Sequence, residues 1–311
     1  MSGAPLPTLR AKIHVPAPLA EPAPAKVNLT LRILGKRRDG YHDLESLVAF
    51  AHVGDRLTLT PGPALGLDVD GPTASAAGDI ADNLVLRVAQ ALVERVEGLR
   101  VGRFALTKHL PVAAGLGGGS ADAAAALRLL ARLNRLDRSD DARLLDAARV
   151  TGADVPVCLD PRPRLMRGIG DVLSSPLDLP ALPAVLVNPG VPVATRDVFA
   201  KLGFAPGERR GEADDLDLGR LADGGALMSY LASHPNDLEA AAISLKPGVA
   251  DVLALLSKQG GCLLARMSGS GATCFGLFGS ERAADAAAHS LISAHPAWWV
   301  SATALGRPRP S

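Results

Sequence analysis

The sequence predicts a mixed fold of strands and helices in two domains, and three observations point to this class. The chain has 311 residues, which corresponds to about two domains of the usual ~100 to 200 residues each. Residues 26–34 alternate strictly between apolar and polar side chains, which is the period of a strand with one buried face. Between residues 82 and 96, apolar side chains recur at every fourth position from Leu84 to Val96, as they do on one face of a helix.

The composition is that of an ordinary globular protein. Hydrophobic residues make up 48% and charged residues 21%, which excludes the disordered and fibrous classes. The net charge of +1 gives no overall field that would attract nucleic acid or an anionic membrane, so any anion needs a local site. We expect a cytoplasmic protein, because the three cysteines are widely spaced and no run of ~18 apolar residues is present.

The first strand places two polar side chains together. Lys26 and Asn28 lie two positions apart in the alternating stretch, so both project from the same polar side of the strand. A turn signal at residues 38–40 follows and leads directly to Tyr41 and His42.

Capping residues and periodicity predict the later elements. Ser120 is expected to cap a helix that runs to Asn134, and Ser139 a second helix that ends at Gly152 in the left-handed conformation. The charged residues 207–220 are expected to form a solvated loop. The remaining predicted strands lie at 56–60, 101–107, 184–187, 263–267 and 273–278, and the remaining helices at 236–245, 249–259 and 280–294.

A Pro-rich segment near residues 170–180 precedes a fresh apolar strand and marks a domain boundary. We therefore expect a flexible Pro-rich tail at residues 1–21, an N-terminal domain at 22–175 and a C-terminal domain at 176–305.

The most informative segment is a glycine-rich loop at residues 111–122 that runs directly into a helix. Glycines let backbone amides approach an anion, and a helix N-terminus adds free N–H groups and partial positive charge. The segment is neither a Walker A loop, because no Gly-Lys-Ser/Thr follows, nor a dinucleotide motif, because Ser120 stands where the third glycine belongs. The loop therefore predicts a phosphate site of another kind.

Two further segments are less decisive when taken alone. A second glycine-rich turn at 267–273 lies between two predicted strands, where a hairpin of small residues or a ligand site explains it about equally well. Asp154 falls between a helix and Pro156, where an aspartate serves either as a turn former or as a functional carboxylate.

Taken together, these segments resemble the GHMP kinase superfamily over roughly residues 22–280. The motifs occur in the family's order at residues 24–29, 40–44, 115–120, 152–156, 236–239 and 267–273. The resemblance implies an α+β, two-domain GHMP kinase fold, with an N-terminal half like domain 2 of ribosomal protein S5 and a ferredoxin-like C-terminal half. It also implies a kinase that uses ATP with Mg²⁺ as cofactors.

The resemblance implies roles for individual residues. Asp154 matches the family's catalytic aspartate, which accepts the hydroxyl proton, and Lys26 matches its catalytic lysine. The resemblance assigns ATP binding to the loop residues Pro111, Val112, Ala113, Ala114, Gly115, Leu116, Gly117, Gly118, Gly119, Ser120 and Ala121. Ala121 departs from the family, where a second serine often follows, and no carboxylate is clearly placed for Mg²⁺, so the metal ligands stay open.

The Tyr-His pair indicates the subfamily whose small-molecule substrate is a cytidine diphosphate derivative of methylerythritol. There the 2-hydroxyl is phosphorylated in non-mevalonate isoprenoid biosynthesis, the cytosine ring stacks on Tyr41, and His42 hydrogen-bonds it. Asn236 and Glu239 are expected to brace the second domain. Residues expected to bind this substrate are Asn28, Tyr41, His42, Thr195, Gly269, Ser270 and Gly271.

Three alternatives stay open at this point. A GHMP kinase for homoserine or mevalonate is expected to lack the Gly40-Tyr-His42 element. A nonenzymatic ligand sensor on the same fold has no chemical need for Lys26 and Asp154. A nucleic-acid-binding protein is the third alternative, but the sequence shows no basic stripe and no series of aromatic residues that would support it.

Overall fold

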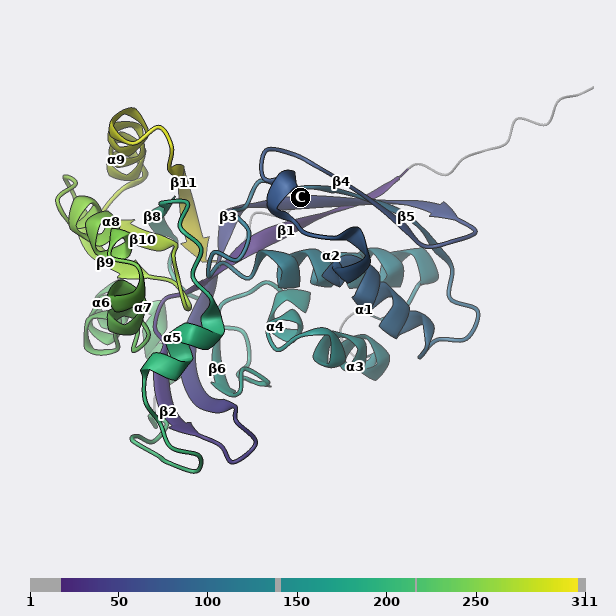
Figure 1. Cartoon of the computed structure of the whole chain (residues 1–311), viewed down its shortest axis with the longest axis horizontal. Coiled ribbons are helices and arrows are strands. Elements are labelled where there is room, and N and C mark those ends of the chain that lie inside the picture. Colours follow the sequence, from purple (N-terminus) through teal and green to yellow (C-terminus); the bar gives the residue numbers. More distant parts are fainter. Residues whose placement is uncertain (1–17, 138–140, 216, 307–311) are drawn as a thin grey trace, which may run out of the picture.

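The computed structural model describes residues 18–137, 141–215 and 217–306, and its strands form one continuous sheet (Figure 1). The strands are β1 Leu19–Asn28, β2 Arg32–Lys36, β3 His42–Gly62, β4 Gly66–Asp70, β5 Val101–Thr107, β6 Arg164–Gly168, β7 Val172–Leu173, β8 Leu182–Asn188, β9 Cys262–Met267, β10 Cys274–Phe278 and β11 Trp299–Gly306. The helices are α1 Leu84–Val93, α2 Gly118–Asn134, α3 Ala142–Thr151, α4 Val155–Leu159, α5 Thr195–Lys201, α6 Gly224–Ser233, α7 Glu239–Leu245, α8 Gly248–Ser257 and α9 Glu281–Ala294. Short 3₁₀ turns lie at Ala74–Ala76, Ile80–Asp82 and Leu218–Ala222.

In the N-terminal half, helices α1 to α4 cover one face of strands β1, β3 and β5 (Figure 1). Helix α2 is central to this layer and packs against β1 and β3. Its alanine block, residues 123–126, is fully buried, because small side chains let the helix backbone approach the sheet closely. Burial of α2 on several sides fixes the position of its N-terminus, where the glycine-rich loop ends.

In the C-terminal half, strands β8, β10 and β9 are covered on both faces. Val185 and Val187 of β8 point to the core shared with α8 and α9, whereas Leu186 between them points to the core shared with α6. Strand β11 lies between β8 and β3, pairing with β8 along most of its length and with β3 at Leu305 and Gly306. The sheet therefore runs through both halves without interruption.

The predicted strand at 26–34 is two strands. Strand β1 ends at Asn28 and β2 starts at Arg32, and between them the amide of Leu29 donates to the carbonyl of Leu47 on β3. The polar side of the alternation is not open to solvent: Lys26, Asn28 and Thr30 are each at most 4% exposed. A buried lysine beside an asparagine indicates a functional site rather than a solvated sheet face.

Two capping predictions are wrong, and one lies outside the described residues. Helix α2 begins at Gly118, and its N-cap is Gly117 in the left-handed conformation (φ 62°), so Ser120 lies inside the first turn. Gly152 ends α3 with φ 177°, which is extended backbone rather than the expected left-handed form. Ser139 is not among the described residues, and Asp141 caps α3 by accepting a hydrogen bond from the amide of Arg143.

The prediction at 101–107 matches β5, the one at 56–60 covers only the last part of the long strand β3, and the other predicted strands and helices match elements of the structure with shifted ends. The tail prediction falls largely on residues 1–17, outside the described part, and β1 already starts at Leu19. None of the helices in the described part of the chain combines the length and the hydropathy that crossing a lipid bilayer requires. Elements without a sequence prediction include α5, α6 and β11.

Candidate active site

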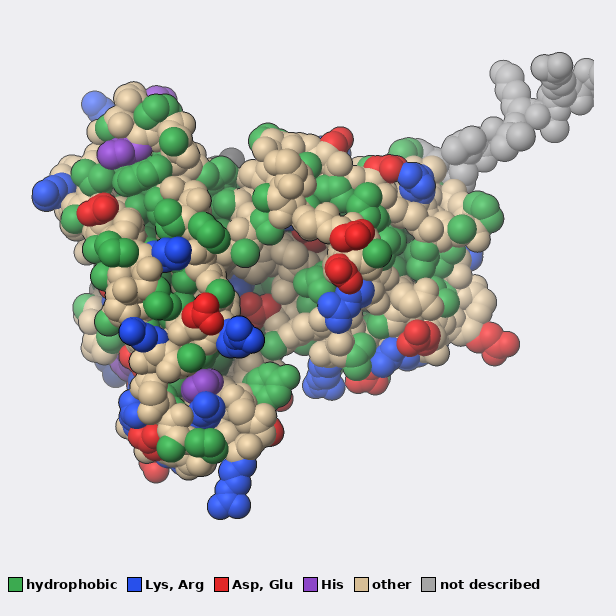
Figure 2. Space-filling model, in the orientation of Figure 1, with side chains coloured by type: hydrophobic (Ala, Val, Ile, Leu, Met, Phe, Trp, Pro, Cys, Tyr) green, Lys and Arg blue, Asp and Glu red, His purple; other side chains and the backbone are tan. Residues whose placement is uncertain are grey.

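A cavity of about 950 Å³ opens between the two halves, and Figure 2 shows the surface hollowed there. Its walls come from distant parts of the chain: β1, the β2–β3 turn, the glycine-rich loop, the start of α2, the residues before α4, and α5. Most of the residues singled out by the sequence line it. They are Lys26, Asn28, Tyr41, His42, Pro111, Val112, Ala113, Ala114, Gly115, Gly117, Gly118, Gly119, Ser120, Asp154, Thr195, Gly269 and Ser270.

Lys26 and Asp154 meet in this cavity. The ammonium Nζ of Lys26 lies 2.9 Å from Oδ2 of Asp154 and donates to Oδ1 of Asn28 at 3.0 Å. Lys26 is 4% exposed, whereas the Asp154 side chain is 38% exposed and reaches the open space. Strand β1 supplies the lysine, and the residue before α4 supplies the aspartate, with Pro156 in the first helical turn, where a missing N–H costs nothing.

Asn28 orients the lysine. Its Oδ1 accepts the bond from Lys26, and its Nδ2 donates to Oγ of Ser46 at 2.7 Å. Its backbone amide donates to Oγ of Ser268 in the second glycine-rich turn. The side chain is therefore fixed from both sides.

The glycine-rich loop wraps the opposite side of the cavity. Gly115 has φ +77°, and a Cβ there would lie 2.4 Å from the carbonyl oxygen of Ser268, so only glycine fits where the two glycine-rich turns touch. Helix α2 then points its N-terminus at the cavity, and such a terminus offers unpaired backbone N–H groups and partial positive charge to an anion. Leu116 and Ala121, by contrast, are 1% exposed core residues that do not line the cavity. The amide of Ala121 already donates to the carbonyl of Gly117, so the structure does not place these two residues for the predicted contact with ATP.

The second glycine-rich turn is a β-hairpin connection, as one of the two sequence interpretations predicted, and it also borders the cavity. Strands β9 and β10 pair antiparallel on either side of it. Asn236 donates to the carbonyls of Met267 and Gly269, and Glu239 accepts from the amide of Met267, which confirms that both residues brace this half. Gly269 and Ser270 line the cavity, and Thr195 lies within hydrogen-bonding distance of Ser270 (2.8 Å between the hydroxyls).

Gly271 of the same turn does not line the cavity. Its φ is +87°, and a Cβ there would lie 2.6 Å from Sδ of Met267, so this glycine is required by the close approach of the methionine. The predicted substrate contact at this position is therefore replaced by a structural role within the turn.

Aromatic side chains form the far end of the cavity. Tyr41 is 58% exposed, and the ring of Phe199 on α5 lies 4.8 Å from the ring of His42. Burial, reinforced by the positive charge of Lys36, lowers the pKa of His42, so the ring is neutral at physiological pH. Its Nε2 is buried without a hydrogen-bond partner among the residues that the structure describes. Sequence reasoning missed Phe199, which stands four residues after Thr195 on the same helix face.

Sequence reasoning also missed a buried charge cluster directly under the glycine-rich loop. Nζ of Lys108 lies 2.5 Å from Oδ2 of Asp55 and 2.7 Å from Oδ2 of Asp122, and a Cβ on Gly118 would lie 3.6 Å from the same Nζ. Burial raises the pKa of Asp122 to about 7, with the neighbouring Asp55 acting in the same direction and Lys108 against it. One signal was available: Asp55 precedes one predicted strand and Lys108 follows another, and these ends meet when β3 pairs antiparallel with β5.

The described residues contain no group of three or more histidine, cysteine, aspartate or glutamate side chains that could hold a metal ion by themselves. A divalent cation that accompanies a nucleotide does not need such a group, because Mg²⁺ keeps several waters and binds substrate phosphates. The helix N-terminus and the glycine amides of the cavity fit the phosphate oxygens that would carry such a cation.

Comparisons with known proteins match both halves of the chain. The family described as GHMP kinases N terminal domain matches residues 83–160, and the family described as GHMP kinases C terminal matches residues 213–297. A 4-diphosphocytidyl-2-C-methyl-D-erythritol kinase of Methylorubrum extorquens is 57% identical over 284 residues, which cover 91% of this chain and 97% of that protein. A protein of the same name from Rhodopseudomonas palustris is 57% identical over 92% of this chain and 99% of its own length.

Solved structures agree with the sequence matches. The crystal structure of a 4-(cytidine 5'-diphospho)-2C-methyl-D-erythritol kinase superposes with a TM-score of 0.74 at 33% identity, covering 93% of this chain and 99% of that one. A homoserine kinase from Cytophaga hutchinsonii superposes with a TM-score of 0.69 at 22% identity, covering 94% of this chain and 96% of that one, which is a likeness of fold alone.

Proposed function

The chain belongs to the GHMP kinases, and we propose that it transfers the γ-phosphoryl group of ATP to the 2-hydroxyl of 4-diphosphocytidyl-2-C-methyl-D-erythritol. The predicted family and its two-domain α+β fold are confirmed. ATP is the phosphoryl donor in this class of kinase, and the relatives' name implies non-mevalonate isoprenoid biosynthesis. The choice of substrate is supported by the relatives' name and by the aromatic end of the cavity at Tyr41, His42 and Phe199.

One observation supports the chemical step most directly: the 2.9 Å pair of Lys26 and Asp154 in a cavity shared with the phosphate loop. In the proposed reaction, Asp154 accepts the proton of the substrate hydroxyl as its oxygen attacks the γ-phosphorus. The ammonium of Lys26 pairs with Asp154 and stabilises the negative charge that develops on the attacking oxygen. Asn28 positions that ammonium.

We propose that the residues of the 111–120 loop hold the triphosphate through backbone amides and the N-terminus of α2. When bound, Mg²⁺ would neutralise charge on the β- and γ-phosphates, held chiefly by those oxygens and water. The buried Lys108 under Gly118 adds a positive charge, which Asp55 and Asp122 offset, behind the loop. The loop therefore binds phosphate mainly with dipoles rather than with a net positive side-chain charge.

We propose that the cytosine ring binds at the aromatic end of the cavity. The exposed Tyr41 offers one ring face, Phe199 a second apolar wall, and His42 a neutral imidazole edge for the polar atoms of the base. Thr195, Gly269 and Ser270 lie between this end and the Lys26–Asp154 pair and are proposed to contact the erythritol and diphosphate portion.

The division into domains and the location of the protein are also proposals. We propose a division into domains at residues 22–175 and 176–305, which the two family matches at 83–160 and 213–297 respect. We also propose a cytoplasmic location for this enzyme, since its phosphoryl donor is ATP.

The substrate is tested by presenting the cytidylyl methylerythritol, mevalonate and homoserine separately with ATP and Mg²⁺ and measuring ADP release. We expect turnover only with the cytidylyl compound, and ³¹P NMR of the product should show a new phosphomonoester beside an intact diphosphate. Turnover with mevalonate or homoserine instead would refute the proposal. Absence of turnover with all three, together with ADP binding, would favour the ligand sensor.

A further inference from the structure

Residues 204–214, here called the strap, run along the free edge of β2. The amide of Lys36 donates to the carbonyl of Glu208, the amide of Gly207 donates back to the carbonyl of Lys36 (both 2.8 Å), and the amide of Arg210 donates to the carbonyl of Leu34. A Cβ on Gly35 would lie 2.7 Å from the carbonyl oxygen of Glu208, so glycine permits this close approach. The segment predicted to be a solvated loop is therefore attached to the β2–β3 hairpin.

One end of the strap packs against the aromatic end of the cavity, where the nucleoside is proposed to bind. The ring of Phe204 meets the ring of His42 edge-on, with centroids 5.8 Å apart, in addition to the contact that Phe199 makes. The guanidinium of Arg210 lies over the ring of Phe204 at 3.9 Å and is itself held by Oε1 of Glu208 at 2.6 Å. His42 is thus packed by two aromatic rings, one of which the strap supplies.

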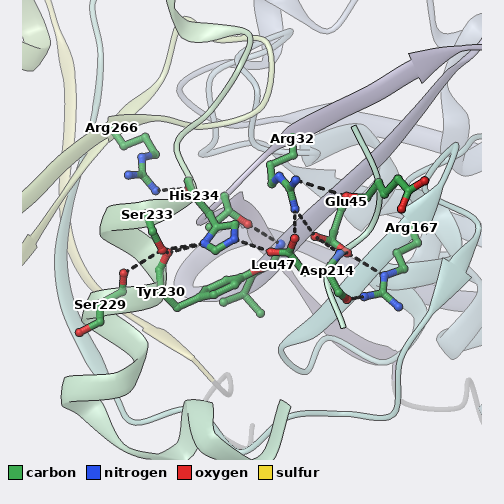
Figure 3. A network of polar contacts seen from close by, with 12 residues as sticks. Arg32, Glu45, Leu47, Arg167, Asp214, Ser229, Tyr230, Ser233, His234 and Arg266 are labelled. Carbon is green, nitrogen blue, oxygen red and sulfur yellow. Dashed lines mark hydrogen bonds and ion pairs between the residues drawn. The ribbon is translucent and has the colours of Figure 1, made fainter. Parts of the chain in front are cut away.

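The other end is anchored by Asp214, as Figure 3 shows. Its carboxylate oxygens lie 2.7 Å from Nη1 of Arg32 and 2.5 Å from Nε2 of His234. Its backbone amide donates to the carboxylate of Glu45 at 3.2 Å, and its carbonyl accepts from Nη2 of Arg167 at 2.5 Å. The anchor therefore joins the strap to β2, β3, β6 and the residue after α6.

The acidic and basic side chains at this anchor form ion pairs with one another. Glu45 is 1% exposed and pairs with both Arg32 and Arg167, so two carboxylates face two guanidinium groups. Burial alone would raise the pKa of Asp214, but the bonds from His234 and Arg32 outweigh it and hold that pKa below its ordinary value. Neutralising Asp214 would leave Arg32 with one carboxylate partner, Glu45, instead of two.

We propose that the strap is a positioning element for nucleoside recognition: Asp214 anchors it to the β2–β3 hairpin, and Phe204 holds the ring of His42 in place. This inference rests on the proposed function, because that function assigns the cytosine to Tyr41 and His42. Neither Asp214 nor Phe204 contacts the Lys26–Asp154 pair or the phosphate loop. The strap thus acts on the affinity for the cytidine portion and not on the affinity for ATP.

The test uses Asp214→Asn, which removes the charge with little change of shape, and Asp215→Asn as its matched control, since the neighbouring Asp215 is exposed. Phe204→Leu is a second variant that leaves the anchor intact. Calorimetric titration with CDP and with ADP measures the two affinities, and hydrogen exchange of the full chain measures the amides of residues 34–42.

We expect Asp214→Asn and Phe204→Leu each to weaken CDP binding about tenfold, the scale of one lost charge-assisted bond or ring contact, with ADP binding unchanged. Asp214→Asn should also speed exchange at 34–42, and Asp215→Asn should change neither quantity. Unchanged CDP affinity in both variants overturns the inference, as does weaker binding of CDP and ADP alike. If the wild-type chain binds ADP but no CDP, the proposed function fails instead, and the exchange rates alone then decide whether Asp214 anchors the hairpin.

Discussion

The sharpest consequence of the proposed chemistry concerns the variant Asp154→Asn. The amide keeps the shape of the carboxylate but cannot accept a proton at neutral pH. Lys26 keeps its bond to Asn28 at 3.0 Å, so the buried ammonium is not left without a partner, and the site should stay assembled.

The magnitude follows from what the group does. Loss of a positioned base lowers the rate by about two to four orders of magnitude, which corresponds to roughly 3 to 5 kcal/mol of activation free energy. The effect on stability is small by comparison. The Asp154 side chain is 38% exposed, and an ion pair with a partner in contact with water contributes about 1 kcal/mol or less to the free energy of unfolding.

The assay is ADP release under saturating ATP and cytidylyl substrate, with ADP affinity measured separately by calorimetry. We expect kcat to fall by the stated factor and ADP affinity to stay unchanged, because the phosphate loop is untouched. The double variant with Lys26→Met should lose little more than the worse single variant, since the two groups act as a unit. A kcat within about threefold of the wild type would refute the assignment of Asp154 as the base.

Three further predictions concern the loop, the buried cluster and the aromatic end. Gly115→Ala should weaken ADP binding at least about tenfold, because its Cβ would lie 2.4 Å from the carbonyl oxygen of Ser268 and would displace the loop. Gly98→Ala is the control: it has similar backbone strain (φ +67°) but no neighbour within 4 Å, and it should leave ADP binding unchanged. Since the pKa of Asp122 is raised to about 7, the folded chain keeps a proton that the unfolded chain releases near pH 4. The free energy of unfolding of the wild type should therefore fall relative to that of Asp122→Asn as the pH rises from 4 to 7. We expect a change of up to about 1 kcal/mol per pH unit, measured by urea titration. Tyr41→Ala should raise the KM for the cytidylyl substrate about ten- to a hundredfold, the scale of one lost stacking contact, and leave the KM for ATP and the melting temperature unchanged because the side chain is 58% exposed.

The glycine-rich loop was predictable because its sequence signal is local. A run of glycines followed by a helix is a property of adjacent residues, and backbone amides at a helix start bind anions whatever the rest of the fold does. Even the error there is local: the helix begins at Gly118 rather than after Ser120, because Gly117 adopts the left-handed form that caps it.

The buried cluster and the strap were not predictable in this way. Asp55, Lys108 and Asp122 meet only because β3 pairs with β5 and α2 packs beneath them, and no periodicity encodes that pairing. Asp214 sits in a charged segment that resembles a solvated loop, and only its contacts in the folded chain, such as those with Arg32 and His234, show that it is held. Contacts between residues that are far apart in the sequence produce no periodic pattern from which they could be predicted.

Strand β11 was missed for a different reason. Its middle, residues 301–304, alternates serine and threonine with alanine, a contrast too weak to give a clear strand period. The structure makes it a strand because it pairs with β8 along most of its length and with β3 at its end, and this pairing replaces the missing hydrophobic pattern.

The 21-residue strand β3 has a mechanical consequence for turnover. It begins at His42, pairs with β1, β2, β5, β6 and β11 along its course, and ends in the far lobe at Gly62. A rotation of one half against the other would have to bend β3 or disturb its pairing with β11 at Leu305 and Gly306. We therefore expect substrates to enter and products to leave through short movements of the turn before Tyr41 and of the glycine-rich loop.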